Sequence, residues 1–135
     1  MKIVHLQSSD KVIFDLEISI AKRSGLIKRM IENLGEDNLN EYLPLSKVES
    51  HILGKVIVFV MHHKDSPIPD NAKEVEMTEW DKQFLKVDIQ TLVALINAAD
   101  FLDMKDLLGL GCIKMRSYLK GNPEKMETAF SNLTI

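Results

Sequence analysis

Histidine, aspartate and cysteine are the residues of this sequence that could do chemistry. His62 and His63 are adjacent, and Asp65 follows them in the stretch MHHKDSPIPD. Imidazole and carboxylate groups bind zinc and exchange protons, so the cluster could form a metal or acid–base site. Adjacent helical residues point about 100° apart, however, and the i, i+4 spacing of HExxH is absent. We therefore interpret the cluster as the polar end of a helix, where histidine and lysine interact favourably with the helix dipole.

Other candidate catalytic groups also lack partners. Cys112 is the single cysteine, and it lies on the apolar arc of an expected helix, which favours packing over nucleophilic catalysis. The carboxylates between residues 70 and 79 lie in a loop without neighbouring groups that would orient them, which disfavours acid–base catalysis by a pair of carboxylates. The motifs GxxxxGK[ST], GxGxxG and GxSxG do not occur. The sequence therefore indicates no catalytic residue, no metal ligand and no cofactor.

Composition points to one folded domain of ordinary size. The chain has 135 residues, of which 45% are hydrophobic and 27% charged, with a net charge of −3. This balance is typical of a globular protein and gives no electrostatic reason to expect nucleic acid. The longest apolar run, VIVFVM, is too short to cross a bilayer, and no signal peptide is recognisable. A single cysteine fits a reducing compartment, so we expect a cytoplasmic and nuclear location.

Strands and helices are both expected in the first half of the chain. Residues 2–7 and 12–18 read as strands, the second alternating apolar and polar side chains, and the turn residues SSDK between them indicate a hairpin. Apolar residues at helical spacing predict a helix in residues 21–35 that ends at a glycine. A capping box at Ser46 and Glu49 predicts the start of the helix that carries the two histidines at its end.

The second half of the chain is expected to be helical after an acidic, proline-containing loop. Asp88 can cap a helix that continues to residue 103 and is apolar on every side, so it is buried all round or covered in part by a partner. Residues 105–120 form a helix with one apolar arc, although Gly109 and Gly111 weaken it by about 1 kcal/mol each relative to alanine. A last, short helix follows GNP at 121–123. Three such helices cover each other only in part, and the remaining apolar surface predicts a protein-interaction site.

The chain resembles a known family through strings that occur together and in order over residues 2–133. The most specific are HHKD, WDKQFLKVD and LINAADFLDMKDLL. They are similar to the Skp family, the S-phase-kinase-associated adaptors of SCF-type ubiquitin ligases. The related elongin C lacks WDxxFLKVD and fits less well.

The resemblance implies an α+β fold of the BTB/POZ type, a small β-sheet flanked by helices, followed by C-terminal helices that bind an F-box. It implies a BTB/POZ-like portion in residues 1–66, an acidic loop in 67–79, helices that complete the fold in 80–104, and F-box-binding helices in 105–135. It also implies a non-catalytic bridge between the N-terminal domain of a cullin and F-box proteins. No cofactor, metal, nucleic acid or membrane is expected.

Site residues follow from the resemblance. Cullin binding is expected at Asp100 and Phe101, where the family usually has asparagine and tyrosine. F-box binding is expected at six apolar positions: Leu108, Cys112, Met115, Leu119, Met126 and Phe130. The first four also belong to the apolar arc of residues 105–120.

Two departures from the family leave alternatives open. Lys11 stands at a turn position where the family generally has glycine, and the chain stops at Ile135, before the acidic, tryptophan-bearing helix that closes over the F-box. One alternative is a truncated or divergent relative that binds a single partner or self-associates as a homodimer. A second is an elongin C-like adaptor, and a third is a small enzyme or metal protein built on His62 and His63.

Overall fold

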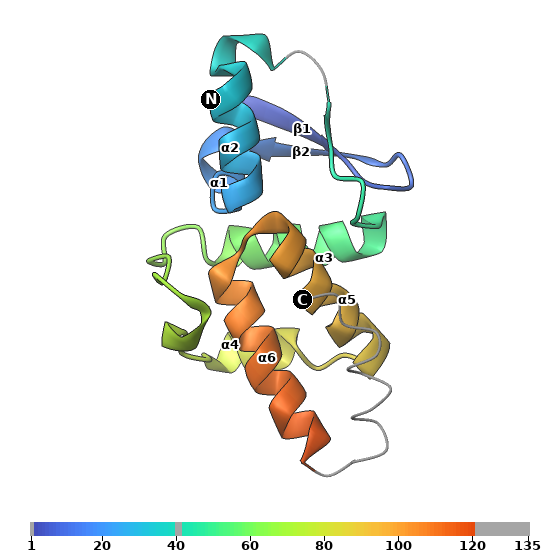
Figure 1. Cartoon of the computed structure of the whole chain (residues 1–135), viewed down its shortest axis with the longest axis vertical. Coiled ribbons are helices and arrows are strands. Elements are labelled where there is room, and N and C mark those ends of the chain that lie inside the picture. The colour runs from blue at the N-terminus through green and yellow to red at the C-terminus, as the bar shows by residue number, and fades with distance from the viewer. Residues whose placement is uncertain (1, 40–41, 121–135) are drawn as a thin grey trace. The chain divides into compact units, whose positions relative to one another are not determined.

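The computed structural model describes residues 2–39 and 42–120. The chain divides into two compact units (Figure 1). The first contains Met1–Pro67 and Phe101–Met104, and the second contains Ile68–Asp100 and Lys105–Ile135. Within the described residues, no helix combines the length and apolarity that a membrane span requires.

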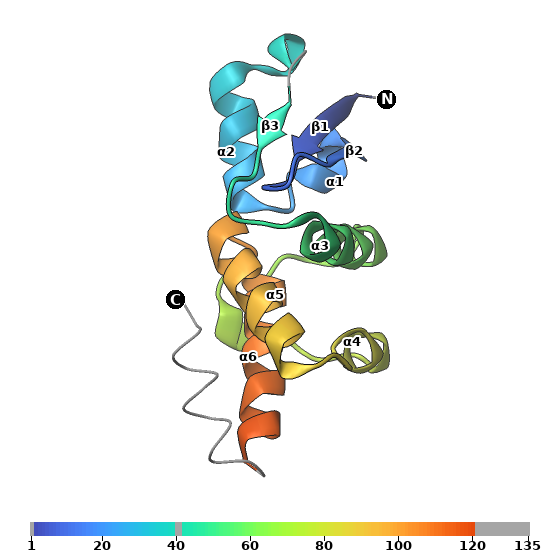
Figure 2. The ribbon, with the colours of Figure 1, turned by 90° about the vertical axis from the view of Figure 1, so that its right-hand side faces the viewer.

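The first unit is built on a three-stranded sheet, whose order β2-β1-β3 places the first strand in the middle (Figure 2). Its strands are β1 (Ile3–Gln7), β2 (Ile13–Glu17) and β3 (Leu43–Pro44). β1 and β2 pair antiparallel, so the expected hairpin is confirmed, and β3 pairs parallel with β1. Val4, Leu6 and Leu16 are buried on the same side of the sheet because alternate residues of a strand share a face. Lys11, in the hairpin turn, adopts a φ of 70°, a conformation that favours glycine.

The helix expected in residues 21–35 is shorter than its apolar pattern suggested. The chain forms α1 (Ile18–Ala21) and then α2 (Gly25–Leu34), followed by the 3-10 helix η1 (Glu36–Asn38). α2 starts at Gly25 because the Ser24 side chain accepts a hydrogen bond from the backbone N–H of Ile27, at 3.2 Å, and caps the helix. Gly35 ends α2 with a φ of 82°, as the sequence predicted.

Helix α3 (Ser50–His62) carries the two histidines at its end, and the prediction of a helix there is confirmed. The predicted capping box at Ser46 is wrong, because the helix starts at Ser50 and the Glu49 side chain makes no capping hydrogen bond. A carboxylate from the hairpin turn takes that role instead. Asp10 accepts hydrogen bonds from the backbone N–H of Ser50 at 2.8 Å and from its hydroxyl at 2.6 Å.

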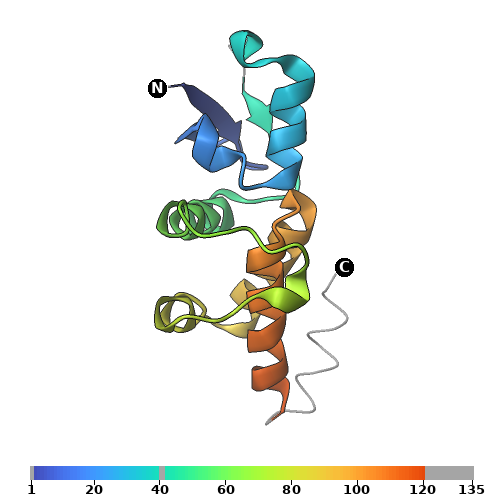
Figure 3. The ribbon, with the colours of Figure 1, turned by 90° about the vertical axis from the view of Figure 1, so that its left-hand side faces the viewer.

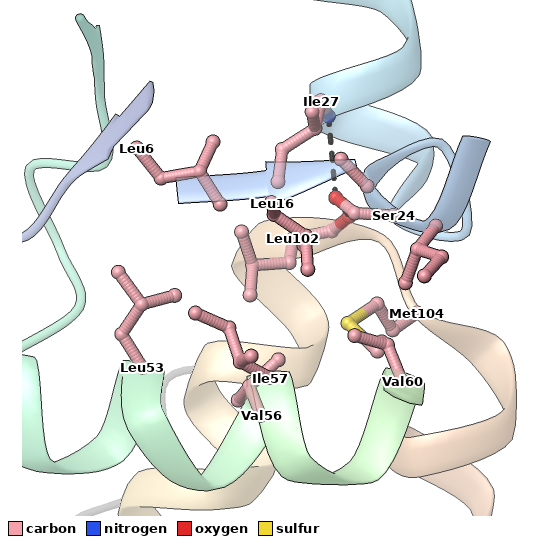
Figure 4. Close-up of a pocket in the computed structure, with 12 residues that line it drawn as sticks. Leu6, Leu16, Ser24, Ile27, Leu53, Val56, Ile57, Val60, Leu102 and Met104 are labelled. Carbon is pink, nitrogen blue, oxygen red and sulfur yellow. Dashed lines mark hydrogen bonds between the residues drawn. The ribbon is translucent and has the colours of Figure 1, made fainter. Parts of the chain in front are cut away.

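The core of the first unit lies between the sheet, α2 and α3 (Figure 4). Leu6 and Leu16 of the sheet face Leu53 and Val56 of α3 across a small apolar cavity. The cavity has a volume of about 10 Å³, which is about the least space that a single water molecule needs and is far below the volume of a ligand pocket. It is a packing defect of the core, and it offers no room for a small molecule.

The second unit is helical. Its elements are the 3-10 helix η2 (Ala72–Glu74) and the helices α4 (Glu79–Phe84), α5 (Ile89–Leu102, whose last two residues belong to the first unit) and α6 (Lys105–Leu119). Thr78 and Asp81 form a reciprocal capping box at the start of α4. The predicted cap of α5 is confirmed, because the Asp88 carboxylate accepts a hydrogen bond from the backbone N–H of Thr91 at 3.3 Å.

Both glycines of α6 allow a close approach to a neighbouring element. Figure 3 shows η2 beside α6. A Cβ atom at Gly109 would collide with the backbone carbonyl oxygen of Ala72, which belongs to η2. A Cβ atom at Gly111 would lie 2.7 Å from Cγ1 of Ile96 in α5. Packing on both sides of α6 therefore offsets the weak helix propensity of these glycines, as the sequence required.

Candidate protein-interaction surfaces

The apolar stripe expected on α6 is present. Leu108, Cys112, Met115 and Leu119 follow one another at intervals of four, three and four residues, which places them on one face of the helix. Met115 and Leu119 are buried, with 4% and 3% of their surface exposed. Leu108 and Cys112 are half-buried and remain accessible to a partner. Met126 and Phe130 lie outside the described residues.

Exposed apolar side chains are distributed differently from the sequence-based expectation. The helices α4, α5 and α6 expose no large apolar side chain, so the described part of this unit has less apolar surface to spare than expected. Most exposed large apolar residues of the described chain lie in the first unit instead: Ile3, Val12, Ile13, Leu34, Tyr42, Val58 and Met61. Strand alternation could have indicated Ile3, since its neighbours Val4 and Leu6 alternate with it and its side chain faces away from the core.

The two residues expected to bind a cullin lie at the C-terminal end of α5. Asp100 is exposed, and Phe101 is half-buried. The Lys47 ammonium group lies 5.9 Å from the centroid of the Phe101 ring, within the range of a cation–π interaction. Lys47 was not predicted as part of this surface, because it precedes Phe101 by more than fifty residues in the printed sequence.

The segment that follows Phe101 is attached to the start of α2. The Ser24 hydroxyl donates a hydrogen bond to the backbone carbonyl of Leu102, at 2.6 Å. The backbone N–H of Gly25 donates to the carbonyl of Asp103, at 3.0 Å. The Asp103 carboxylate pairs with Arg29 at 2.9 Å, and the Asp103 backbone adopts a φ of 54°. We call these four residues, Ser24, Gly25, Arg29 and Asp103, the α2 joint.

The histidines behave as the end of a helix. Their rings contact each other edge-on with centroids 4.8 Å apart, and the His63 ring also contacts Phe59. His63 Nδ1 lies 3.2 Å from the Ser66 hydroxyl oxygen. In residues 2–39 and 42–120, no three histidine, cysteine, aspartate or glutamate side chains gather in an arrangement that could hold a metal ion.

Cys112 is a poor nucleophile at neutral pH. Burial raises the pKa of its thiol above the ordinary value, and the positive charge of Arg116 opposes this rise only in part. The thiolate is the reactive form of cysteine, so a raised pKa leaves the side chain mostly protonated and unreactive. Its position on the apolar stripe therefore fits packing or partner contact.

Comparison with known proteins agrees with the resemblance seen in the sequence. The family described as "Skp1 family, tetramerisation domain" matches residues 2–65. The "E3 ubiquitin ligase complex SCF subunit sconC" of Talaromyces stipitatus is 40% identical, with 95% of this chain and 83% of that protein aligned. The protein of the same name from Arthroderma otae is 37% identical, with 95% of this chain and 81% of that protein aligned. The small three-stranded sheet with its helices is an α+β fold of the BTB/POZ type, as expected. The chain belongs to the Skp1 family.

Proposed function

We propose that this chain is a non-catalytic adaptor of an SCF-type E3 ubiquitin ligase. In this role it binds the N-terminal domain of a cullin and an F-box protein at the same time, and so brings a substrate receptor to the ligase. One observation carries the proposal. The similarity to proteins named as SCF subunits covers 95% of the chain, and therefore includes α5 and α6 as well as the first unit.

The F-box contact is proposed on the apolar stripe of α6. Leu108 and Cys112 are half-buried on its accessible part, so a partner can cover them without rearrangement. Met115 and Leu119 continue the stripe but are buried, and they belong to the proposed set because they lie on the same face of α6 as Leu108 and Cys112. Met126 and Phe130 complete the proposed set.

A pair of substitutions on α6 tests the F-box contact. Leu108→Asp places a charge on the stripe, and desolvating that charge against an apolar partner is costly. We expect it to weaken binding of an F-box peptide at least about a hundredfold, which corresponds to about 3 kcal/mol. Ser117→Asp is the matched control, because Ser117 is exposed and lies about two and a half turns after Leu108, on the opposite side of the helix. Equal affinities of the two variants in isothermal titration calorimetry would refute the assigned face.

The cullin contact is proposed at Asp100 and Phe101. Truncating Phe101 to alanine removes an aromatic side chain, the kind of residue that often dominates an interface. We expect Phe101→Ala to weaken binding of a cullin N-terminal domain about tenfold or more, and to leave F-box binding unchanged. Val58→Ala is the control, since Val58 is an exposed apolar residue on α3 of the same unit. A cullin affinity that Phe101→Ala and Val58→Ala change equally would contradict this assignment.

A second candidate is self-association as a homodimer when no partner is bound. It is favoured by the apolar side chains that the first unit exposes on and beside its sheet, among them Ile3, Ile13 and Tyr42. Light scattering of the isolated chain tests it. A mass that stays at one chain up to high concentration would remove this candidate and leave the adaptor proposal intact.

A further inference from the structure

We propose that the α2 joint is a positioning device for the cullin contact, and that it sets the pose of Phe101. This inference rests on the proposed function and deepens it, since it names residues that act on the same contact from a different helix. None of the four joint residues is itself placed at the cullin contact. They act on the contact indirectly, because they bind the backbone directly after Phe101.

The joint holds the two residues directly after Phe101 by hydrogen bonds to their backbone carbonyl groups. The carbonyl groups of Leu102 and Asp103 both accept hydrogen bonds, from the Ser24 hydroxyl at 2.6 Å and from the Gly25 N–H at 3.0 Å. Ser24 is buried, with 2% of its surface exposed, so its hydrogen bond is shielded from water. Its oxygen also accepts from the N–H of Ile27 and caps α2 (Figure 4). The start of α2 and the chain next to Phe101 are therefore held by one side chain.

The fit at Gly25 leaves no room for a side chain. A Cβ atom there would collide with the Asp103 carboxylate and would lie 3.1 Å from Cβ of Asp103. The Asp103 carboxylate can rotate away by giving up its exposed pair with Arg29, but its Cβ, at 3.1 Å, moves only with the backbone. A displaced Asp103 shifts the adjoining backbone, and this changes the position of the Phe101 ring.

The contact of Phe101 with Lys47 does not oppose this shift. The ring is half-buried and is approached from one side by the Lys47 ammonium group, 5.9 Å from its centroid. An exposed cation–π contact is weak, so it follows the backbone rather than opposing it. The joint therefore sets the pose that the cullin meets together with the last turn of α5, in which Phe101 lies.

Gly25→Ala is the direct test, and the chain offers a matched control. At Gly54, in α3 of the same unit, an added Cβ meets only Phe14 Cε1 at 3.8 Å, an ordinary contact. We expect Gly25→Ala in the full chain to weaken binding of a cullin N-terminal domain about tenfold, as when the competent pose is populated in about a tenth of the molecules. It should shift the ring resonances of Phe101 in NMR spectra and leave F-box affinity unchanged. Gly54→Ala should change neither the cullin affinity, nor the Phe101 ring resonances, nor the F-box affinity.

A second substitution separates positioning from general damage. Asp103→Gly removes the carboxylate that Gly25→Ala meets and suits the positive φ. The double variant Gly25→Ala/Asp103→Gly should therefore bind the cullin domain more tightly than Gly25→Ala, because the overlap is gone while the backbone hydrogen bonds from Ser24 and Gly25 remain. It should stay somewhat weaker than the unchanged chain, because the pair with Arg29 is lost. If the double variant stays as weak as Gly25→Ala, or if Gly25→Ala binds normally, the positioning role is overturned. If the unchanged chain binds no cullin domain, the proposed function fails, and the Phe101 resonances alone decide whether the joint positions the ring.

Discussion

Three glycines in helices should respond to the same substitution in three different ways. Replacing a helical glycine by alanine gains about 1 kcal/mol of helix propensity when space is available. At Gly54 the nearest atom to an added Cβ is 3.8 Å away, so Gly54→Ala should keep most of this gain. At Gly111 the added Cβ lies 2.7 Å from Cγ1 of Ile96, which is itself 1% exposed and cannot swing outward.

The change in the free energy of unfolding depends on which atoms must move to make room for the added Cβ. Overpacking a core side chain costs about 1–3 kcal/mol, so Gly111→Ala should be neutral or destabilising by up to about 2 kcal/mol after the propensity gain. At Gly109 the obstacle is the backbone carbonyl of Ala72, and the whole turn of η2 must leave α6. A backbone cannot rotate away as a side chain can, so the overpacking cost should reach about 3–4 kcal/mol, at or above the top of that range. After the propensity gain we expect Gly109→Ala to destabilise by about 2–3 kcal/mol.

Thermal unfolding followed by circular dichroism measures the series. At about 4 °C per kcal/mol for a chain of this size, Gly54→Ala should raise the Tm by about 3–4 °C. Gly109→Ala should lower it by about 8–12 °C, with Gly111→Ala between the two. A Gly109→Ala variant that melts at or above the Tm of the unchanged chain would refute the close packing of η2 on α6.

Three further outcomes are expected from the first unit. Hydrogen bonds from Ser50 and Ser8 lower the pKa of Asp10 from 3.8 to about 2, so its stabilising contribution is complete above about pH 4 and is lost as the pH falls through 2. Urea unfolding from pH 6 down to pH 2 should therefore show a smaller acid loss for Asp10→Ala, and an unchanged profile would contradict this. Lys11→Gly should raise the free energy of unfolding by up to about 1 kcal/mol, because it relieves a left-handed backbone; a decrease would count against that strain. Ser24→Ala should lower the free energy of unfolding by about 2 kcal/mol through loss of a cap and a buried hydrogen bond, and a change below about 0.5 kcal/mol would argue against both contacts.

Elements with a strong local pattern could be predicted from the sequence. Three features depend only on residues close together in the sequence: the alternation of β2, the glycine that ends α2 and the carboxylate that caps α5. Two local signals were present but were not used. Ser24 before Gly25 marks the true start of α2, and Thr78 with Asp81 is the capping box of α4.

Features that depend on distant residues could not be predicted in the same way. The cap of α3 comes from Asp10, forty positions before Ser50, so the nearby Ser46 and Glu49 were a misleading match to the capping-box pattern. Burial of Met115 and Leu119 depends on tertiary packing around α6, which the apolar stripe alone does not reveal. The contact of Lys47 with Phe101 likewise exists only in the folded chain.

Formation of a three-component complex tests the adaptor role most directly. The full chain is mixed with a cullin N-terminal domain and an F-box protein, and the mass is measured by size-exclusion chromatography with multi-angle light scattering. We predict one species with the summed mass of one copy of each component, and no complex of the other two when this chain is omitted. A chain that forms only one binary complex, or that releases one partner when the other is added, would contradict the bridging role.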